Sequence, residues 1–262
     1  MSGTSMIPEQ RRHEILAHLR REPVKSYAQL AEALGVSHMT VRRDAQVLAD
    51  QGRARLTQGG VAAAHSMGVE PPRPEKARAR TPEKSAIARE AARLVEDSTA
   101  VYLDAGTTIA MLAPLLLERR DLTVVTNDLS TAVALLDHPG VELIMIGGRV
   151  DRANHSTHGR MATAGLAELT LDLAFISCSS WDVRRGLTTP TEAKVDPKRT
   201  AMHVAARSVL VADSSKHGSY ATHRVAALDE LDVLVTDDGL DPSALALLRE
   251  AGPELVLAAV GP

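Results

Sequence analysis

The chain has 262 residues, of which 44% are hydrophobic and 24% are charged, and its net charge is −3. This composition is typical of a globular protein long enough to form two domains. Only 2% of the residues are aromatic, so aliphatic side chains must fill the core.

The composition also excludes several classes of protein. The longest apolar run, residues 109–117, contains Pro114 and is too short to span a membrane. The N-terminus lacks the apolar stretch of a signal peptide. Cys178 is the only cysteine, and the histidines are not spaced as metal ligands. We therefore expect a cytoplasmic protein that carries no metal or other cofactor.

Charge is distributed unevenly along the chain. Through Lys84, 14 Lys and Arg residues stand against 9 Asp and Glu residues, whereas the remainder holds 16 against 24. A basic first part and an acidic second part indicate that only the first part meets nucleic acid.

The first part of the chain predicts three helices followed by a β-hairpin. Apolar residues at helical spacing mark a helix over 8–20 and a second over 27–34, which Ser26 can cap. The third helix begins after Ser37 and ends near Gln51 and Gly52. Residues 53–61 then form two short strands, closed by Gly59 and Gly60. This order predicts a winged helix-turn-helix.

The third helix has the features of a DNA-recognition helix. Ser37 is a good N-cap residue, and Val41, Ala45 and Leu48 recur at the spacing of one buried stripe. The residues on the opposite side, together with one on the wing, form the candidate DNA-binding set: Met39, Arg42, Arg43, Gln46 and Arg55. Guanidinium groups can bind phosphate or guanine, and an amide can bind adenine. The alternative is an ordinary amphipathic helix with a solvated basic face.

Residues 64–84 are rich in Pro, Arg, Lys and Glu and poor in large apolar side chains, which is typical of a solvated linker. The predicted organisation is therefore a DNA-binding domain over 6–62, a linker over 63–83, and an effector-binding domain over 84–262.

From Lys84 onward, helices and strands alternate. A helix is expected over 85–95, and further helices over 109–117 and 130–136. Short apolar runs predict strands over 100–103, 122–126, 142–146, 173–177, 208–212 and 233–236. Strands this apolar, alternating with helices, indicate an α/β domain with a mainly parallel sheet that is covered on both faces.

Polar residues follow the predicted strands, where ligands of open α/β sheets bind. The four segments are residues 104–108, 126–128, 147–149 and 213–216. Gly106 allows a ligand to approach the backbone, Thr107 and Thr108 offer hydroxyls, and the following helix N-terminus favours an anion. No Walker sequence is present. Hydroxyls, glycines and a few cations at one sheet edge suit a phosphorylated polyol.

These motifs, taken in order, resemble the DeoR family of bacterial sugar-metabolism regulators. The resemblance rests on Ser-x-x-Thr-Val-Arg-Arg-Asp from Ser37, the wing ending Gln-Gly-Gly, and Leu-Asp-Ala-Gly-Thr-Thr from Leu103. It continues through Val-Val-Thr-Asn from Val124, Ile-Gly-Gly from Ile146, Gly-Leu-Thr-Thr from Gly186 and Ala-Asp-Ser-Ser-Lys from Ala212.

The resemblance implies a transcription factor, usually a repressor, with an effector half of the ribose-5-phosphate isomerase fold. It also implies a phosphorylated sugar as effector and a dimer or tetramer on operator DNA. Ser37, Thr40, Arg42 and Arg43 would contact DNA. The residues that would contact the effector are Asp104, Gly106, Thr107, Thr108, Thr126, Asn127, Gly147, Gly148 and Lys216.

One segment departs from the family pattern. Relatives place a glycine-rich turn where this chain has Ser177-Cys-Ser-Ser-Trp-Asp, a loop expected to shape the pocket. Two alternative functions remain at this stage. The effector half could be a sugar-phosphate isomerase or deaminase, with Asp104 as base and Lys216 as charge stabiliser. It could instead be a protein-interaction module with a degenerate pocket.

Overall fold

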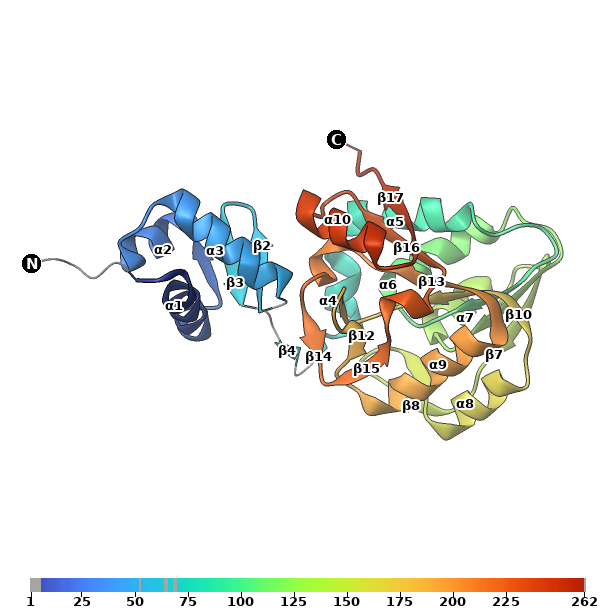
Figure 1. Cartoon of the computed structure of the whole chain (residues 1–262). Helices are drawn as coiled ribbons and strands as arrows, with labels where there is room; N and C mark the ends of the chain where they lie inside the picture. Colours follow the sequence, from blue (N-terminus) through green and yellow to red (C-terminus); the bar gives the residue numbers. More distant parts are fainter. Residues whose placement is uncertain (1–5, 52, 64–65, 68–69, 262) are drawn as a thin grey trace, which may run out of the picture. The chain divides into compact units, whose positions relative to one another are not determined.

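The computed structural model of the chain describes residues 6–51, 53–63, 66–67 and 70–261. These residues divide into two compact units, and Figure 1 shows the helices and strands of each. The first unit contains residues up to Ser66 together with Gly218–Tyr220. The second contains Met67–His217 and the residues from Ala221 onward.

The first unit is a winged helix-turn-helix, which confirms the prediction. Its helices are α1 (Pro8–Arg21), α2 (Tyr27–Leu34) and α3 (His38–Asp50). Its antiparallel sheet has the order β1 (Val24–Ser26), β3 (Gly60–Ala63), β2 (Ala54–Thr57). The strand β1 was not predicted, because residues 24–26 were expected only to end the first helix. Gly52, one expected end of the third helix, lies outside the described residues.

Local sequence signals explain these helices. Ser26 Oγ accepts a hydrogen bond from the Gln29 N–H (3.2 Å), and the Gln29 side chain accepts from the Ser26 N–H (2.9 Å), so α2 begins with a capping box. Gly35 ends α2 at φ +62°, a left-handed conformation that favours glycine. The buried core of the unit includes Ile15, Leu19, Leu30, Val41, Ala45 and Leu48.

The second unit is built on a parallel sheet of seven strands. Their order is β17 (Glu254–Ala258), β16 (Val233–Asp237), β13 (Ala205–Val211), β10 (Leu171–Ile176), β5 (Ala100–Leu103), β6 (Leu122–Thr126), β7 (Val141–Met145). Each neighbouring pair is parallel. All six predicted strands are confirmed, with small shifts at their ends, whereas β17 was not predicted.

Both faces of this sheet are buried. Leu103 and Phe175 pack into the core on one face, and Tyr102 and Ile176 pack into the core on the other. The strand order reverses between β5 and β10, because β6 and β7 follow β5 in one direction while β13, β16 and β17 follow β10 in the other. A crevice beyond the carboxyl ends of such a pair is the usual ligand site of open α/β sheets.

Helices and short strands complete the second unit (Figure 1). The helices are α4 (Arg73–Arg78), α5 (Thr81–Ala92), α6 (Thr107–Leu112), α7 (Leu129–Leu135), α8 (Arg160–Ala167), α9 (Val195–Val204) and α10 (Pro242–Glu250). Short 3-10 turns cover Ala113–Leu116, Glu192–Lys194, Ser214–Lys216 and Leu228–Glu230. An antiparallel hairpin joins β8 (Arg149–Asp151) to β9 (Ser156–His158), and a small sheet has the order β11 (Ser180–Asp182), β12 (Gly186–Thr189), β15 (His223–Ala226). Two further short strands, β4 (Ser66–Met67) and β14 (Tyr220–Ala221), have one residue in each unit.

The second part of the segment that was expected to be a solvated linker is folded into the second unit. Residues 70–83 belong to the second unit and contain α4 and the start of α5. Arg73 is 7% exposed and forms an ion pair with Asp128 (2.7 Å), and Lys84 is buried. Charged residues that form ion pairs have the same composition as a solvated connector, which is why the sequence did not separate the two. Residues 64–65 and 68–69 of the expected linker lie outside the described residues.

Candidate functional site

A buried polar cluster lies where β5 and β10 end side by side. Asp104 follows β5, and its Oδ2 accepts hydrogen bonds from the backbone N–H (2.9 Å) and the hydroxyl (2.7 Å) of Ser177, which follows β10. Lys198 of α9 forms an ion pair with Asp104 and donates to the carbonyl (2.8 Å) and hydroxyl (3.0 Å) oxygens of Ser177. Asp104 is 2% exposed and Lys198 is 6% exposed. Each buried charge is therefore compensated inside the cluster, which joins two strand ends to α9.

The residues that follow β6 hold the surrounding loops. Thr126 Oγ donates to the last carbonyl of β5 (2.6 Å). Asn127 accepts from a backbone N–H of the β5–α6 loop (2.9 Å) and donates to a carbonyl of β9 (3.0 Å). Asp128 accepts from the Gly106 N–H (3.3 Å), caps α7 and pairs with Arg73. Thr126 and Asn127, both expected effector residues, thus also position the backbone around the cluster.

Gly106, Thr107 and Thr108 form the turn from β5 into α6. A Cβ atom on Gly106 would lie 2.9 Å from the Ser177 Cβ atom, so a larger residue would push Ser177 away from Asp104. Thr107 is half-buried at the start of α6. The Thr108 hydroxyl is buried and has no hydrogen-bond partner among the described residues.

The remaining expected effector residues lie in two other loops. Gly147 and Gly148 precede β8, and Gly148 has φ +154° with a hypothetical Cβ atom 2.8 Å from the His158 carbonyl oxygen. This close approach requires glycine. Lys216 lies in the turn after β13 and donates to the Cys178 carbonyl (3.0 Å). Lys216 therefore reaches the loop that follows β10.

A small cavity, of about 10 Å³, opens beside the buried cluster. Asp104 and Asn127 are the two expected effector residues that line it, and Lys198 and Lys194 are cations in its wall. Its other lining residues are Ala105, Asn154, Ser156, Thr157, His158 and Pro197. The wall thus presents two lysines, a carboxylate, amides and hydroxyls to one small space.

His158 has an unsatisfied nitrogen at this cavity. Its Nδ1 is buried and has no hydrogen-bond partner within the described part of the chain. Burial lowers the pKa of His158 more than the nearby Asp151 carboxylate raises it. The neighbouring Lys194 lowers this pKa further. At neutral pH the ring is therefore uncharged and can exchange one hydrogen bond with a ligand.

A second cavity, of about 230 Å³, shares Asn154 and Lys194 with the first. Glu70 bridges two lysines in its wall, with Oε1 2.7 Å from Lys76 Nζ and Oε2 3.0 Å from Lys194 Nζ. Lys194 Nζ also lies 3.0 Å from Asp151 Oδ2. Burial raises the pKa of Glu70, but Lys194 and Lys76 outweigh it, and the pKa falls to about 2. The second cavity therefore contains an ionised network of two acids and two lysines.

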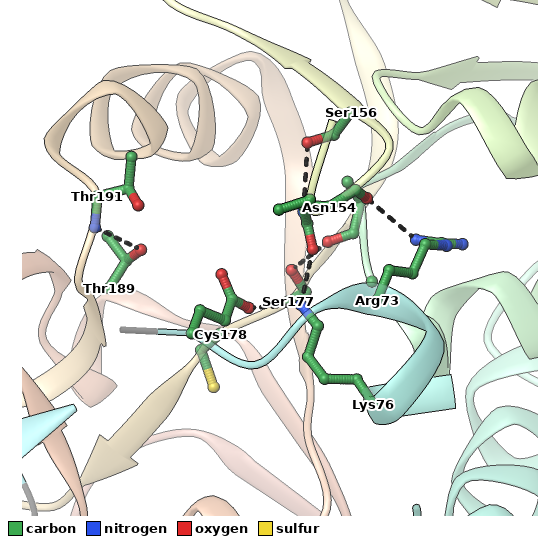
Figure 2. Close-up of polar contacts among 12 residues, drawn as sticks. Arg73, Lys76, Asn154, Ser156, Ser177, Cys178, Thr189 and Thr191 are labelled. Carbon is green, nitrogen blue, oxygen red and sulfur yellow. Dashed lines mark hydrogen bonds and ion pairs between the residues drawn. The ribbon is translucent and has the colours of Figure 1, made fainter. Parts of the chain in front are cut away.

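Asn154 connects the two cavities to α4. Its side-chain oxygen accepts from Lys76 Nζ (2.7 Å), and its amide donates to Ser156 Oγ (3.2 Å), as Figure 2 shows. Arg73 of α4 donates its backbone N–H to the Ala153 carbonyl (2.9 Å). The helix α4 is thus attached to the β8–β9 hairpin at the edge of both cavities.

Sequence reasoning missed the lysines of α9 and the acids and lysines around α4. Lys194 and Lys198 are four residues apart at the start of a helix, so they share one face, and they follow the Gly-Leu-Thr-Thr motif. That spacing could have identified the two lysines as a pair on one side of the helix start. Glu70 and Lys76 gave none, because Glu70 pairs with Lys194 and Lys76 donates to Asn154, 124 and 78 residues away in sequence.

The helix α3 presents the expected DNA-binding residues to solvent. Ser37 Oγ accepts from the Thr40 N–H (3.2 Å) and thereby caps the helix. Met39 is 68% exposed, and Arg42 and Arg43 are exposed. Gln46 donates to Asp50 Oδ1 (2.9 Å). The two arginines and the methionine thus lie on the solvent side of a helix whose other side is buried.

Two further residues relate to this surface. Asp44 is 4% exposed on the opposite side of α3 and accepts from Arg11 of α1 (2.8 Å), with Arg12 at 3.8 Å. This ion pair fixes α3 against α1. Arg55, the expected wing residue, lies on β2 and is half-buried.

The loop that departs from the family pattern is mostly buried. Cys178 is 6% exposed, as expected for a small core residue, and burial raises the pKa of its thiol to about 11. Trp181 is fully buried, and the centroid of its ring lies 4.7 Å from the centroid of the His217 ring. Asp182 pairs with Arg185 (2.8 Å). Trp181 is therefore a core residue of the second unit.

No group of three or more His, Cys, Asp and Glu side chains in the described part of the chain is arranged to hold a metal ion. None of the described helices combines the length and apolar character needed to cross a membrane.

Comparison with known proteins places both units in one family. Residues 11–67 match the DeoR-like helix-turn-helix domain, and residues 79–238 match the DeoR C-terminal sensor domain. The chain is 42% identical over 253 residues to the uncharacterized HTH-type transcriptional regulator YgbI of Escherichia coli strain K12, covering 97% of this chain and 99% of that protein. It is 33% identical over 259 residues to a putative aga operon transcriptional repressor of Escherichia coli O157:H7, covering 98% and 95% respectively.

Among solved structures, the chain is similar to ribose 5-phosphate isomerase A from Methanocaldococcus jannaschii. The TM-score is 0.38 at 18% identity, with 51% of this chain and 53% of that chain covered.

Proposed function

Because the chain belongs to the DeoR family of transcriptional regulators, we propose that it is a repressor of carbohydrate-metabolism genes controlled by a phosphorylated sugar. The sugar binds at the carboxyl ends of β5 and β10. The helix α3 and the wing bind operator DNA, and the chain acts as a homo-oligomer on paired half-sites. As a transcriptional regulator the chain is not an enzyme, so the isomerase or deaminase alternative is set aside.

The observation that carries the effector proposal is the chemistry of the smaller cavity. Asp104 and Asn127 offer acceptors and donors for sugar hydroxyls. His158 Nδ1 is buried and has no hydrogen-bond partner among the described residues. Lys194 in the same wall supplies positive charge for a phosphate. An apolar ligand would leave His158 Nδ1 without a hydrogen-bond partner, which costs free energy.

The DNA-binding proposal rests on the exposed face of α3. Arg42 and Arg43 supply cations, and Met39 and Gln46 lie on the same side of the helix. Ser37 and Thr40 lie at its N-terminus, where hydroxyls and backbone N–H groups can bind phosphate. Arg55 on the wing extends this surface toward the DNA backbone.

Regulation then requires that the sugar favours one of two states of the oligomer. A ligand changes operator affinity only through its different affinity for the two states, with typical coupling of about 1–3 kcal/mol, or roughly 5–150-fold. We propose that Asp104, Asn127, Lys194 and Lys198 make this distinction, with the loops of Gly106–Thr108, Gly147–Gly148 and Lys216 around them.

The DNA arm is tested by operator binding of Arg42→Ala and Arg43→Ala variants to promoter fragments of the chain's own locus. If the arginine binds a base, we expect the variant to lose about 1–3 kcal/mol of operator-binding free energy and to be less specific. If the arginine binds a phosphate, we expect operator binding to depend less steeply on salt concentration. Arg249→Ala removes an exposed charge from α10 and serves as the matched control. Unchanged operator affinity in both α3 variants would refute the assignment of the helix.

The effector arm is tested by operator binding in the presence of a panel of phosphorylated sugars and their unphosphorylated counterparts. We expect at least one phosphorylated member to change operator affinity, and Lys194→Ala to abolish the change while leaving DNA binding without the sugar intact. Equal effects of phosphorylated and unphosphorylated sugars would contradict a phosphate-binding cavity.

A further inference from the structure

The Glu70 carboxylate contacts two lysines of the second unit. Its two carboxylate oxygens contact one lysine each, Lys76 from α4 and Lys194 from the turn before α9. The Glu70 side chain is 19% exposed, and that of Lys194 is 11% exposed. Two lysines converging on one partly buried carboxylate form an anion site that a residue of the chain already fills.

The same lysine faces the proposed sugar cavity. Lys194 lines both cavities, so a ligand seated beside Asp104 and Asn127 can reach it directly. Asn154 also lines both cavities and accepts a hydrogen bond from Lys76. Of the two lysines that bind Glu70, Lys194 thus lies in the wall shared by the two cavities, and Lys76 contacts that wall through Asn154.

We propose that Lys76 and Lys194 form the phosphate subsite of the effector pocket, that Glu70 occupies this subsite in the unliganded protein, and that a phosphorylated ligand displaces it. This inference rests on the proposed function, because it assumes that a phosphorylated ligand enters this site.

Charge favours the exchange. A phosphate monoester carries about −1.5 to −2 charges at pH 7 and three acceptor oxygens, against one charge and two oxygens on Glu70. Asp151 remains paired with Lys194 after Glu70 leaves, and it opposes the incoming anion. Lys216, which is close enough to Lys76 to lower its pKa, adds positive charge nearby. The phosphate thus gains more from the lysines than the carboxylate loses.

Displacement has a consequence for the chain that joins the two units. Glu70 lies just before α4, while Arg73 and Lys76 attach α4 itself to Asp128, Ala153 and Asn154. When the phosphate displaces Glu70 and draws Lys76 toward itself, the segment from Glu70 through α4 loses contacts with the rest of the second unit. Ligand binding is thereby converted into a change in the segment that leads from the DNA-binding unit.

The test uses the full-length protein, inorganic phosphate as the probe, and the Glu70→Gln variant. Calorimetric titration should give phosphate affinity about tenfold higher for Glu70→Gln than for the unsubstituted chain, because the internal competitor is weakened. Glu75→Gln, which changes an exposed acid five residues away in α4, is the matched control and should bind as the unsubstituted chain does. Equal or weaker binding by Glu70→Gln overturns the inference.

Amide hydrogen exchange of α4 provides a second measurement. Phosphate should accelerate exchange in Arg73–Arg78 of the unsubstituted chain and change it little in Glu70→Gln, where the contact is already lost. If phosphate binds both proteins equally and Lys194→Ala abolishes that binding, the subsite is real but Glu70 is not its occupant. If phosphate binds neither protein and no phosphorylated sugar affects operator binding, the proposed function itself fails.

Discussion

Replacing Lys198 by Ala should destabilise the second unit strongly, because all three ammonium protons have partners in the buried cluster. Lys198 Nζ contacts Asp104 and both oxygens of Ser177, and it is 6% exposed. Removing one partner of a buried ion pair costs about 3–5 kcal/mol. Asp104 retains the hydrogen bonds from the Ser177 N–H and hydroxyl, so we expect the lower part of that range, about 3 kcal/mol.

Trp181 makes this loss measurable in the second unit alone. It is the only tryptophan of the chain, it is fully buried, and it packs in the core of the second unit. Urea unfolding followed by tryptophan emission therefore reports on that unit. In thermal unfolding, a loss of about 3 kcal/mol corresponds to a decrease of about 6–12 °C in Tm for a domain of this size.

Two controls make the result decisive. Arg249→Ala, an exposed substitution on α10, should change stability by no more than about 0.5 kcal/mol. The double variant Lys198→Ala, Asp104→Ala should be more stable than the sum of the single losses by about 1 kcal/mol or more, because it leaves no unpaired charge. A loss below about 1 kcal/mol for Lys198→Ala would show that the ion pair is not desolvated.

Three further predictions concern other ionisable groups. The Glu70 pKa is 4.5 when unperturbed and about 2 in the fold, so its contribution of about 3 kcal/mol is complete above pH 4.5 and is lost as the pH falls toward 2. By pH 3.5 the unsubstituted chain should therefore lose about 1 kcal/mol more than Glu70→Gln in urea unfolding, and parallel losses would contradict the pairing. Asp44→Asn should accelerate amide exchange in α3 by about tenfold, whereas Asp50→Asn should not, because only Asp44 is buried against Arg11. Cys178, buried and with its pKa raised to about 11, should react with a thiol reagent at pH 8 only in the unfolded chain, and rapid labelling of the native protein would refute its burial.

The sequence predicted those elements whose signals are local. Ser26 and Ser37 cap α2 and α3 where the capping rule places them, and the apolar runs of the second unit became parallel strands. Asp104 was singled out because it follows a strand, and it does lie in the cavity wall. In each case the deciding residues are near one another in the chain.

Features that depend on distant partners were not predictable. Lys194 lies in the turn before α9 and Lys198 in its first turn, so their spacing is a local signal, but that Lys198 pairs with Asp104 depends on contact between distant parts of the chain. The segment 70–83 has the composition of a solvated connector, and only its contacts with Asp128, Asn154 and Lys194 reveal that it is packed. The strand β17 pairs with β16 and completes the sheet near the end of the chain, where no prediction was made.

The aliphatic core has a consequence for how the protein tolerates change. Alanine, valine and leucine dominate the buried residues, and Trp181, Tyr102 and Phe175 are the large aromatic exceptions among them. Ile→Val in a core costs about 0.5–1.5 kcal/mol, whereas Leu→Ala costs about 2–5 kcal/mol, so exchange between aliphatic residues of similar volume is tolerated best. The three rings lie in the second unit, so the truncations that leave the largest voids fall there. The DNA-binding unit, filled by leucine, isoleucine, valine and alanine, should therefore change in sequence mainly by exchange among these aliphatic residues.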